Sequence, residues 1–115
     1  PVILENKGKL FMVAGSPGGS TIPTTVLQVI TNVVDFGMDI GKAVDAGRFH
    51  HQWLPDCISC ENPSIDSVTI MKLKQIGHTI RERSSLGRVN AIAILPDGRI
   101  KAGADRRGVN SAFGY

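Results

Sequence analysis

The start of the chain alternates short apolar runs with turn-forming residues, a pattern typical of strands. Residues 1–4 and 10–14 are mostly apolar, and between them stand Asn6 and Gly8, residue types that favour tight hairpin turns. We therefore expect two antiparallel strands joined by a hairpin at the start of the chain.

A different period follows, in which apolar residues recur at steps of three and four. Between Ile22 and Phe36 these positions form one stripe of a helix. Asp39 can cap a shorter second helix, and Ser64 or Asp66 can cap a third. The three predicted helices run from about residues 21–23 to Gly37, over residues 40–46 and over residues 64–76, the last two being stopped by Gly47 and Gly77.

The rest of the chain contains strand-like segments and one irregular region. Residues 48–65 hold aromatic residues, two prolines and two cysteines without a clear period, so we expect an extended loop with one short strand at most. Pro96-Asp97-Gly98 is a tight-turn signal. Strands are predicted over residues 78–82, 89–95 and 100–104. Helices between hairpin-forming strands indicate an α+β layered fold with a mostly antiparallel sheet.

Length and composition limit the classes of protein to which this chain can belong. Its 115 residues, 42% of them apolar, suffice for one modest domain. The net charge of +3 comes from scattered basic residues, paired only at Arg81/Arg83 and Arg106/Arg107, so no nucleic-acid partner is expected. No apolar stretch approaches the roughly 20 residues that span a bilayer. Because Pro1 opens strand-like sequence, we interpret the chain as part of a longer unit.

The run Gly15-Ser16-Pro17-Gly18-Gly19-Ser20 lies between the second predicted strand and the first helix. It matches neither a P-loop nor a dinucleotide-binding fingerprint. One interpretation is a plain turn that glycine permits. The other, which we favour, is an oxyanion hole made by the backbone amides of Gly18 and Gly19, because a helix start leaves N–H groups unpaired and residues without Cβ admit a substrate. Ser16 is interpreted as a turn or capping residue rather than a nucleophile.

A second kind of chemistry is offered by Cys57-Ile58-Ser59-Cys60, which His50 and His51 precede. A C-x-x-C pair can be a redox pair or half of a zinc site, and two histidines can complete four ligands. Adjacent histidines do not easily turn toward one ion, and no second cysteine pair exists, so a disulfide or two free thiols is favoured. A non-catalytic thiol or zinc-binding module using Cys57, Cys60, His50 and His51 is the alternative function, and the preferred function includes no metal.

Several motifs taken together resemble the γ-glutamyltranspeptidase family. They are Gly15-Ser16-Pro17-Gly18-Gly19-Ser20, Thr25-Val26-Leu27-Gln28, Arg48-Phe49-His50-His51-Gln52-Trp53-Leu54-Pro55-Asp56, Gly103-Ala104-Asp105 with Arg107, and the closing Gly114-Tyr115. The resemblance runs in register over essentially all 115 residues. It corresponds to the C-terminal part of that family's small subunit.

The resemblance implies an N-terminal-nucleophile hydrolase with an αββα sandwich, made as a precursor that cleaves itself into a large and a small subunit. In that family the N-terminal threonine of the small subunit attacks the γ-glutamyl amide of glutathione or a related compound, with its own α-amino group as base. The acyl-enzyme then passes to an amino acid, a peptide or water. The family's oxyanion hole, which also contacts the substrate, falls here on Gly18 and Gly19. No cofactor is implied.

The chain also departs from the family pattern. It starts at Pro1, whereas the family's nucleophilic threonine lies upstream of the matching position, and proline has no hydroxyl that can replace it. The family's usual Asp-Pro-Arg appears here as Asp105-Arg106-Arg107. We therefore expect residues 1–115 to form a single partial domain that lacks the nucleophile and is inactive alone.

The expected partners follow from this interpretation. They are the rest of the small subunit, the large subunit of the same precursor, and a small-molecule substrate such as glutathione, an amino acid or a peptide. An isolated fragment would expose an apolar sheet face or edge, which favours a homo-oligomer. The resemblance implies a periplasmic, secreted or cell-surface location, which the chain itself does not indicate. An inactive homologue that keeps the fold is a further alternative.

Overall fold

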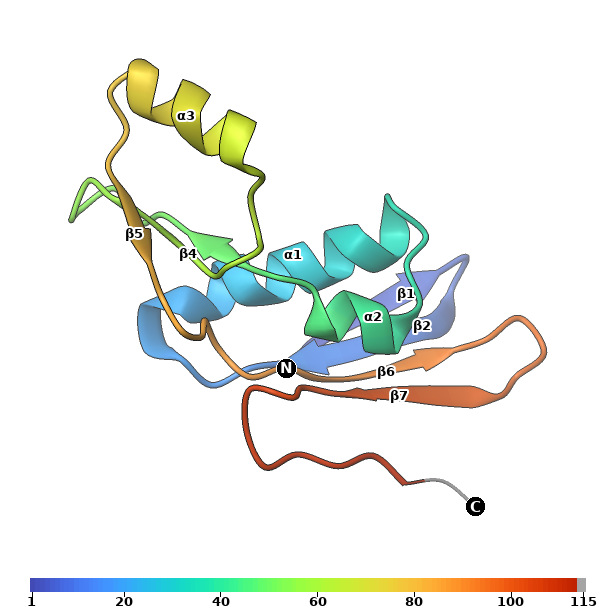
Figure 1. Cartoon of the computed structure of the whole chain (residues 1–115). Helices are drawn as coiled ribbons and strands as arrows, with labels where there is room; N and C mark the ends of the chain where they lie inside the picture. The colour runs from blue at the N-terminus through green and yellow to red at the C-terminus, as the bar shows by residue number, and fades with distance from the viewer. Residues whose placement is uncertain (114–115) are drawn as a thin grey trace.

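The larger of two sheets is built from both ends of the chain. The computed structural model describes residues 1–113, and in it β1 (Val2–Asn6), β2 (Lys9–Gly15), β6 (Asn90–Ile94) and β7 (Ile100–Ala104) form one antiparallel sheet in the order β1-β2-β6-β7 (Figure 1). Lys7 and Gly8 connect β1 to β2 with φ of 51° and 72°, as a tight hairpin requires. The predicted N-terminal hairpin is therefore confirmed, as are the strands near residues 89–95 and 100–104.

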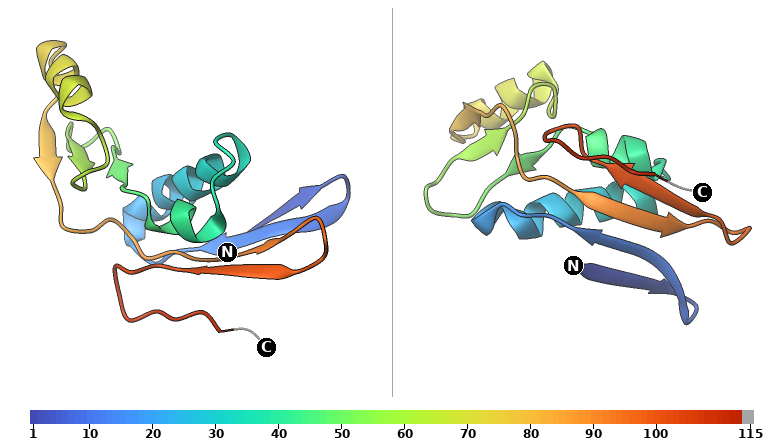
Figure 2. Two further views of the ribbon diagram at one scale, coloured as in Figure 1. Left: turned by 45° about the vertical axis from the view of Figure 1, so that its right-hand side comes forward. Right: turned by 90° about the horizontal axis from the view of Figure 1, so that it is seen from below.

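Two helices cover one face of this sheet (Figure 2). A short 3₁₀ turn (Gly19–Thr21) leads into α1 (Ile22–Val34), and α2 (Ile40–Asp45) follows, with the Asp39 carboxylate accepting a hydrogen bond from the Gly41 N–H at 3.0 Å. The prediction that Asp39 caps the second helix is confirmed. Alternate residues of β2 and β6 pack against apolar residues of the helices to form the core: Met12, Ala14, Val26, Val29, Ile40, Ala43, Val44, Val89, Ala91 and Ala93.

The end of α1 differs slightly from the sequence prediction. The helix ends at Val34, three residues before Gly37. Gly37 has a φ of +62°, and the chain then turns so that the Met38 N–H donates to the Asn32 carbonyl at 2.9 Å. Gly37 thus reverses the direction of the chain, as expected. The helix itself ends about one turn before this glycine, earlier than the apolar stripe predicts.

The smaller sheet belongs to a separate layer that carries α3 (Ser67–Gln75). Its strands are β3 (Phe49–His50), β4 (Ile58–Cys60) and β5 (Ile80–Glu82), with β3 antiparallel and β5 parallel to β4. The Asp66 carboxylate caps α3 by accepting from the Thr69 N–H at 2.9 Å, so Asp66 and not Ser64 is the cap. The expectation of one short strand at most in residues 48–65 is wrong, because strands of two and three residues are too short to show a period.

The larger sheet has a second face that no helix covers among the described residues (Figure 2). Ile3 and Ile92, on this outer face, are 66% and 37% exposed, and the segment after β7 runs back beneath it (Figure 1). A sheet with helices on only one face matches one half of the αββα sandwich that the family resemblance implies. The described residues contain no helix of the length and apolarity needed to cross a membrane.

Candidate functional site

The turn between β2 and α1, residues 15–20, is held in a backbone conformation that requires glycine; we call it the glycine turn. Gly18 and Gly19 have φ of 141° and 58°. A Cβ on Gly18 would lie 2.5 Å from Thr21 Oγ1, whereas a Cβ on Gly19 would have no atom within 4 Å. The structure therefore leaves open space in front of Gly19, through which a ligand can approach the backbone.

The glycine turn leaves two adjacent backbone donors without an acceptor among the described residues. Within residues 1–113, neither the Gly18 N–H nor the Gly19 N–H donates to an acceptor in the protein, because they precede the first turn of the helical segment. The dipole of the 13-residue α1 adds a partial positive charge at the same end. Two adjacent free donors at a helix start can hold an oxygen that gains negative charge, as in the tetrahedral intermediate of acyl transfer.

A loop far away in sequence, residues 84–88, packs on the glycine turn. Ser16 Oγ accepts from the Arg88 N–H at 3.0 Å and donates to the Pro17 carbonyl at 2.6 Å, so Ser16 is a turn residue, as predicted. A Cβ on Gly87 would lie 2.8 Å from both Ser16 Oγ and Thr25 Cγ2. Glycine at this position is therefore what allows the loop to approach. Between the two segments lies a cavity of about 360 Å³, lined by Pro17, Gly18, Ser85, Gly87, Arg88 and Arg107.

Four charged side chains form a buried ion cluster behind this loop. Arg48 and Asp105 are 1% and 0% exposed, and Glu61 and Arg107 are nearly as buried. The ion pairs are Arg48 Nη2 to Asp105 Oδ2 at 2.8 Å, Arg107 Nη1 to Asp105 Oδ1 at 3.1 Å and Arg107 Nη2 to Glu61 Oε2 at 2.5 Å. Two positive and two negative charges balance, which is the condition for keeping charges out of water.

The ion cluster fixes the backbone on both sides of Gly87 and Arg88. Glu61 accepts from the Leu86 N–H at 2.6 Å, and Arg48 donates to the Leu86 carbonyl at 2.9 Å. Three residues beyond Leu86, the Val89 N–H donates to Asp105 at 2.8 Å. The loop is thus anchored at Leu86 and at Val89, and the residues between these anchors face the glycine turn.

Burial and hydrogen bonding act in opposite directions on the two carboxylates of the cluster. Burial alone raises the pKa of Glu61, but the hydrogen bonds from Arg107 and from backbone N–H groups outweigh it and hold that pKa below its usual value. For Asp105, burial likewise raises the pKa, and hydrogen bonds from Val89, Arg107 and Arg48 lower it further than burial raises it. Both carboxylates are therefore ionised at neutral pH.

The structure does not support the alternative thiol or zinc module. His50 is buried and both its ring nitrogens are engaged, Nδ1 with Thr24 Oγ1 at 2.7 Å and Nε2 with Gln52 Oε1 at 2.9 Å. His51 Nε2 contacts Asp56 Oδ1 at 3.1 Å. Among residues 1–113, no group of three or more His, Cys, Asp or Glu side chains is arranged to hold a metal ion.

The two cysteines are free thiols. Cys60 lies in β4 and is 4% exposed, and burial raises the pKa of its thiol. Cys57 lies just before that strand, where its N–H donates to the Pro55 carbonyl at 2.8 Å. The predicted choice between a disulfide and two free thiols is therefore settled in favour of free thiols, and neither reaches the glycine turn.

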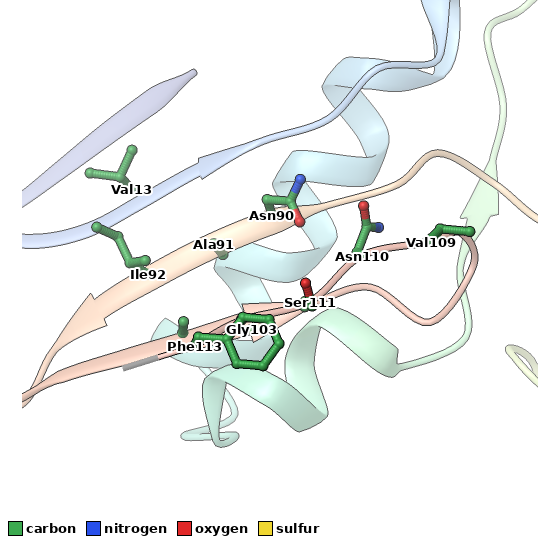
Figure 3. A pocket seen from close by; sticks show the side chains of 12 residues that line it. Val13, Asn90, Ala91, Ile92, Gly103, Val109, Asn110, Ser111 and Phe113 are labelled. Atoms are coloured by element: carbon green, nitrogen blue, oxygen red, sulfur yellow. The ribbon is translucent and has the colours of Figure 1, made fainter. Parts of the chain in front are cut away.

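A second cavity, of about 530 Å³, lies on the outer face of the larger sheet (Figure 3). Val13 and Ile92 line it from the sheet, and Val109 and Phe113 from the segment that runs beneath (Figure 3). Val109 and Phe113 are almost fully exposed. The lining mixes apolar side chains with Asn90, Asn110 and Ser111 and has no titratable group, so it offers a packing surface rather than a site of acid-base chemistry. Gly114-Tyr115, the last of the motifs that carry the family resemblance, lie outside the described residues.

Comparison with known proteins identifies the class. The chain is 40% identical over 111 residues to the glutathione hydrolase proenzyme of Escherichia coli K12, a match that covers 96% of this chain and 19% of that protein. It superposes on the T380A mutant of Helicobacter pylori γ-glutamyltranspeptidase with a TM-score of 0.89 and 44% identity, covering 94% of this chain and 60% of that chain. It shares its fold with the Bacillus anthracis transpeptidase CapD, at a TM-score of 0.83 and 20% identity, over 100% of this chain and 69% of that chain.

The sheet with helices on one face and the glycine turn at the start of α1 thus define an α+β protein with the N-terminal-nucleophile hydrolase fold. The family model for γ-glutamyltranspeptidase matches residues 1–115. The chain belongs to the γ-glutamyltranspeptidase family. It spans about a fifth of the length of the bacterial glutathione hydrolase proenzymes that it matches.

Two residues of the site had no signal in the sequence. Glu61 and Arg88 stand outside every motif, and their partners lie 46 and 72 positions away, at Arg107 and Ser16. Arg48 and Arg107 belong to resembling segments, but nothing in those segments predicts that they are buried together. A charged residue between apolar positions is more often exposed, so only the three-dimensional arrangement reveals the ion cluster.

Proposed function

We propose that this chain supplies the oxyanion hole of a γ-glutamyltransferase, an enzyme that transfers or hydrolyses the γ-glutamyl group of glutathione and related amides. The observation that carries this proposal is the pair of free, adjacent N–H groups at Gly18 and Gly19, with open space in front of Gly19. The nucleophile and the rest of the substrate site come from the regions of the full-length enzyme that lie outside these 115 residues. The chain alone is then inactive.

The proposed partner of the outer sheet face is the remainder of the same precursor. The radius of gyration, 15.3 Å, exceeds the roughly 13 Å of a compact domain of this size. Apolar side chains at Ile3, Ile92 and Phe113 are exposed on or beneath the uncovered face. Surfaces of this kind mark sites of association, and a second sheet packed there completes the sandwich.

The assay uses the full-length polypeptide and γ-glutamyl-4-nitroanilide, whose cleavage releases a coloured amine. The full-length protein should turn the substrate over, whereas the purified 115-residue chain should not. Turnover by the chain alone would show that the nucleophile lies within it. No turnover by the processed full-length protein would instead favour the inactive homologue.

The role of the two amides needs a change that removes only an N–H. Proline is unsuitable, because the φ values of 141° and 58° are incompatible with its ring. Glycolic acid in place of Gly18 or Gly19, introduced by ligation of a synthetic segment, exchanges the amide N–H for an ester oxygen. Loss of one oxyanion donor should lower kcat by about 10²–10³-fold.

Gly37 provides the matched control for this substitution. It has a positive φ of 62°, follows a helix and has an N–H that donates to no acceptor within residues 1–113. The ester at Gly37 should leave kcat unchanged. An unchanged kcat for the esters at both Gly18 and Gly19 would reject the oxyanion assignment.

A further inference from the structure

Arg88 places an unpaired positive charge beside the glycine turn. Its side chain lines the same cavity as Gly18, and it is exposed to solvent. Within residues 1–113 its guanidinium has neither a hydrogen-bond acceptor nor a carboxylate partner, whereas the other arginine of the cavity, Arg107, is bound to Glu61 and Asp105. A guanidinium offers a planar fork of donors that matches a carboxylate.

Hydrogen bonds fix the backbone of Arg88 and of the residues on both sides of it. Its N–H donates to Ser16 Oγ of the glycine turn at 3.0 Å, and its neighbours Leu86 and Val89 are bound to the ion cluster. Gly87 lies against the turn, since a Cβ on Gly18 would be 3.5 Å from Gly87 Cα. The side chain of Arg88 therefore starts from a fixed point close to Gly18.

Gly108 provides the space that the Arg88 side chain occupies. A Cβ at position 108 would overlap Arg88 Cδ and lie 3.0 Å from Nη1. The side chain thus runs across Gly108 while remaining at the wall of the cavity. The guanidinium stays in water, where it binds a carboxylate weakly and reversibly.

We propose that Arg88 forms a carboxylate-binding subsite for the amine portion of the substrates: the leaving amine of the donor and the incoming amine of the acceptor, when these carry a carboxylate. The inference rests on the proposed function. The amides of Gly18 and Gly19 hold the oxygen of the reacting carbonyl, and the amine is bonded to that same carbon. The amine portion must enter and leave in every cycle, which suits weak binding by an exposed cation better than the permanent burial given to Arg107.

The test compares two chromogenic donors that differ by one carboxylate, γ-glutamyl-4-nitroanilide and γ-glutamyl-3-carboxy-4-nitroanilide. In the full-length protein, Arg88→Gln should lower kcat/KM for the carboxylated donor about tenfold, the size of one charge-assisted hydrogen bond at a partly solvated site. The kcat/KM for the uncarboxylated donor should stay within twofold. Both donors carry the same glutamyl carboxylate, so binding at the glutamyl end would lower both values equally and overturn the inference.

Arg99→Gln is the matched control, because it removes the same charge at the opposite end of β6 and β7, where Arg99 pairs with Asp97. It should change neither kcat/KM. If Arg88→Gln and Arg99→Gln lower the carboxylated donor alike, the effect is one of net charge and the subsite does not exist.

A measurement on the unmodified protein covers the case in which the Arg88 variant fails to mature. The ratio of kcat/KM between the carboxylated and uncarboxylated donors should fall as NaCl rises from 0.05 to about 1 M, because salt screens an exposed ion pair. A ratio independent of salt would overturn the subsite. Absence of turnover with both donors would instead count against the proposed function itself.

Discussion

Replacing Glu61 with glutamine tests whether the buried ion cluster organises the fold. The Glu61 carboxylate accepts four hydrogen bonds: Oε1 from the Leu86 N–H and Arg107 Nε, both at 2.6 Å, and Oε2 from the Arg48 N–H at 2.9 Å and Arg107 Nη2 at 2.5 Å. Glutamine keeps the shape but only one of the two acceptor oxygens. Its amide NH₂ would face a backbone donor and a guanidinium donor at once.

The expected loss of stability is large for a single isosteric change. Removing one negative charge leaves the two arginines with only Asp105, so the neutral cluster becomes a buried net charge of +1. Breaking a buried pair in this way costs about 3–5 kcal/mol, mainly through the uncompensated charge. Domains of this size have about 5–15 kcal/mol in total, so Glu61→Gln should remove a substantial share of the stability.

Urea unfolding of the chain, followed by far-UV circular dichroism, measures this loss. With a slope of about 1.5 kcal/mol per molar urea, the unfolding midpoint should fall by about 2–3 M. Glu82→Gln is the matched control: Glu82 is exposed on β5, its carboxylate has no partner within residues 1–113, and its replacement should change the stability by less than about 0.5 kcal/mol. If the two variants unfold within 1 kcal/mol of each other, the cluster does not organise the fold.

Two further outcomes follow from the same contacts. The pKa values of Glu61 and Asp105 lie below their usual 4.5 and 3.8, so their contribution to stability is complete above pH 5 and is lost as the pH falls through the depressed values. The urea midpoint should be constant from pH 7 to 5 and drop below about pH 4; equal midpoints at pH 6 and 3 would contradict the assignment. In Gly47→Ala the new Cβ would overlap the Pro63 carbonyl oxygen, which should cost about 1–3 kcal/mol, checked by urea unfolding against Gly41→Ala.

Local signals account for the parts of the fold that the sequence predicts. The α1 stripe, the Asp39 cap and the hairpin at Lys7-Gly8 each depend on residues within a few positions of one another. The glycine turn is likewise local, since its conformation depends on Gly18 and Gly19 themselves. Such features are readable because the residues that specify them are neighbours in the chain.

Long-range pairing accounts for most of what the sequence does not predict. β3 is only two residues long and β4 only three, too short to show an alternating pattern, and their paired residues lie nine and eleven positions apart. Arg48 and Asp105 are 57 positions apart, and each belongs to a charged residue type that is usually exposed. The burial of each of these charges depends on the other three charges of the cluster being present, a condition that no single segment displays.

The long-range ion cluster and the local glycine turn are connected, because the cluster fixes the loop of residues 84–88 that packs on the turn. Glu61 and Arg48 hold both backbone groups of Leu86, and Asp105 holds the Val89 N–H, so Gly87 and Arg88 are suspended between two anchors against Ser16. Within the described residues, the charged side chains make no hydrogen bond to Gly18 or Gly19. They influence the glycine turn through the loop that they hold in place. A change at Glu61 that leaves the chain folded should therefore still displace Arg88, and it should weaken the carboxylated donor more than the uncarboxylated one.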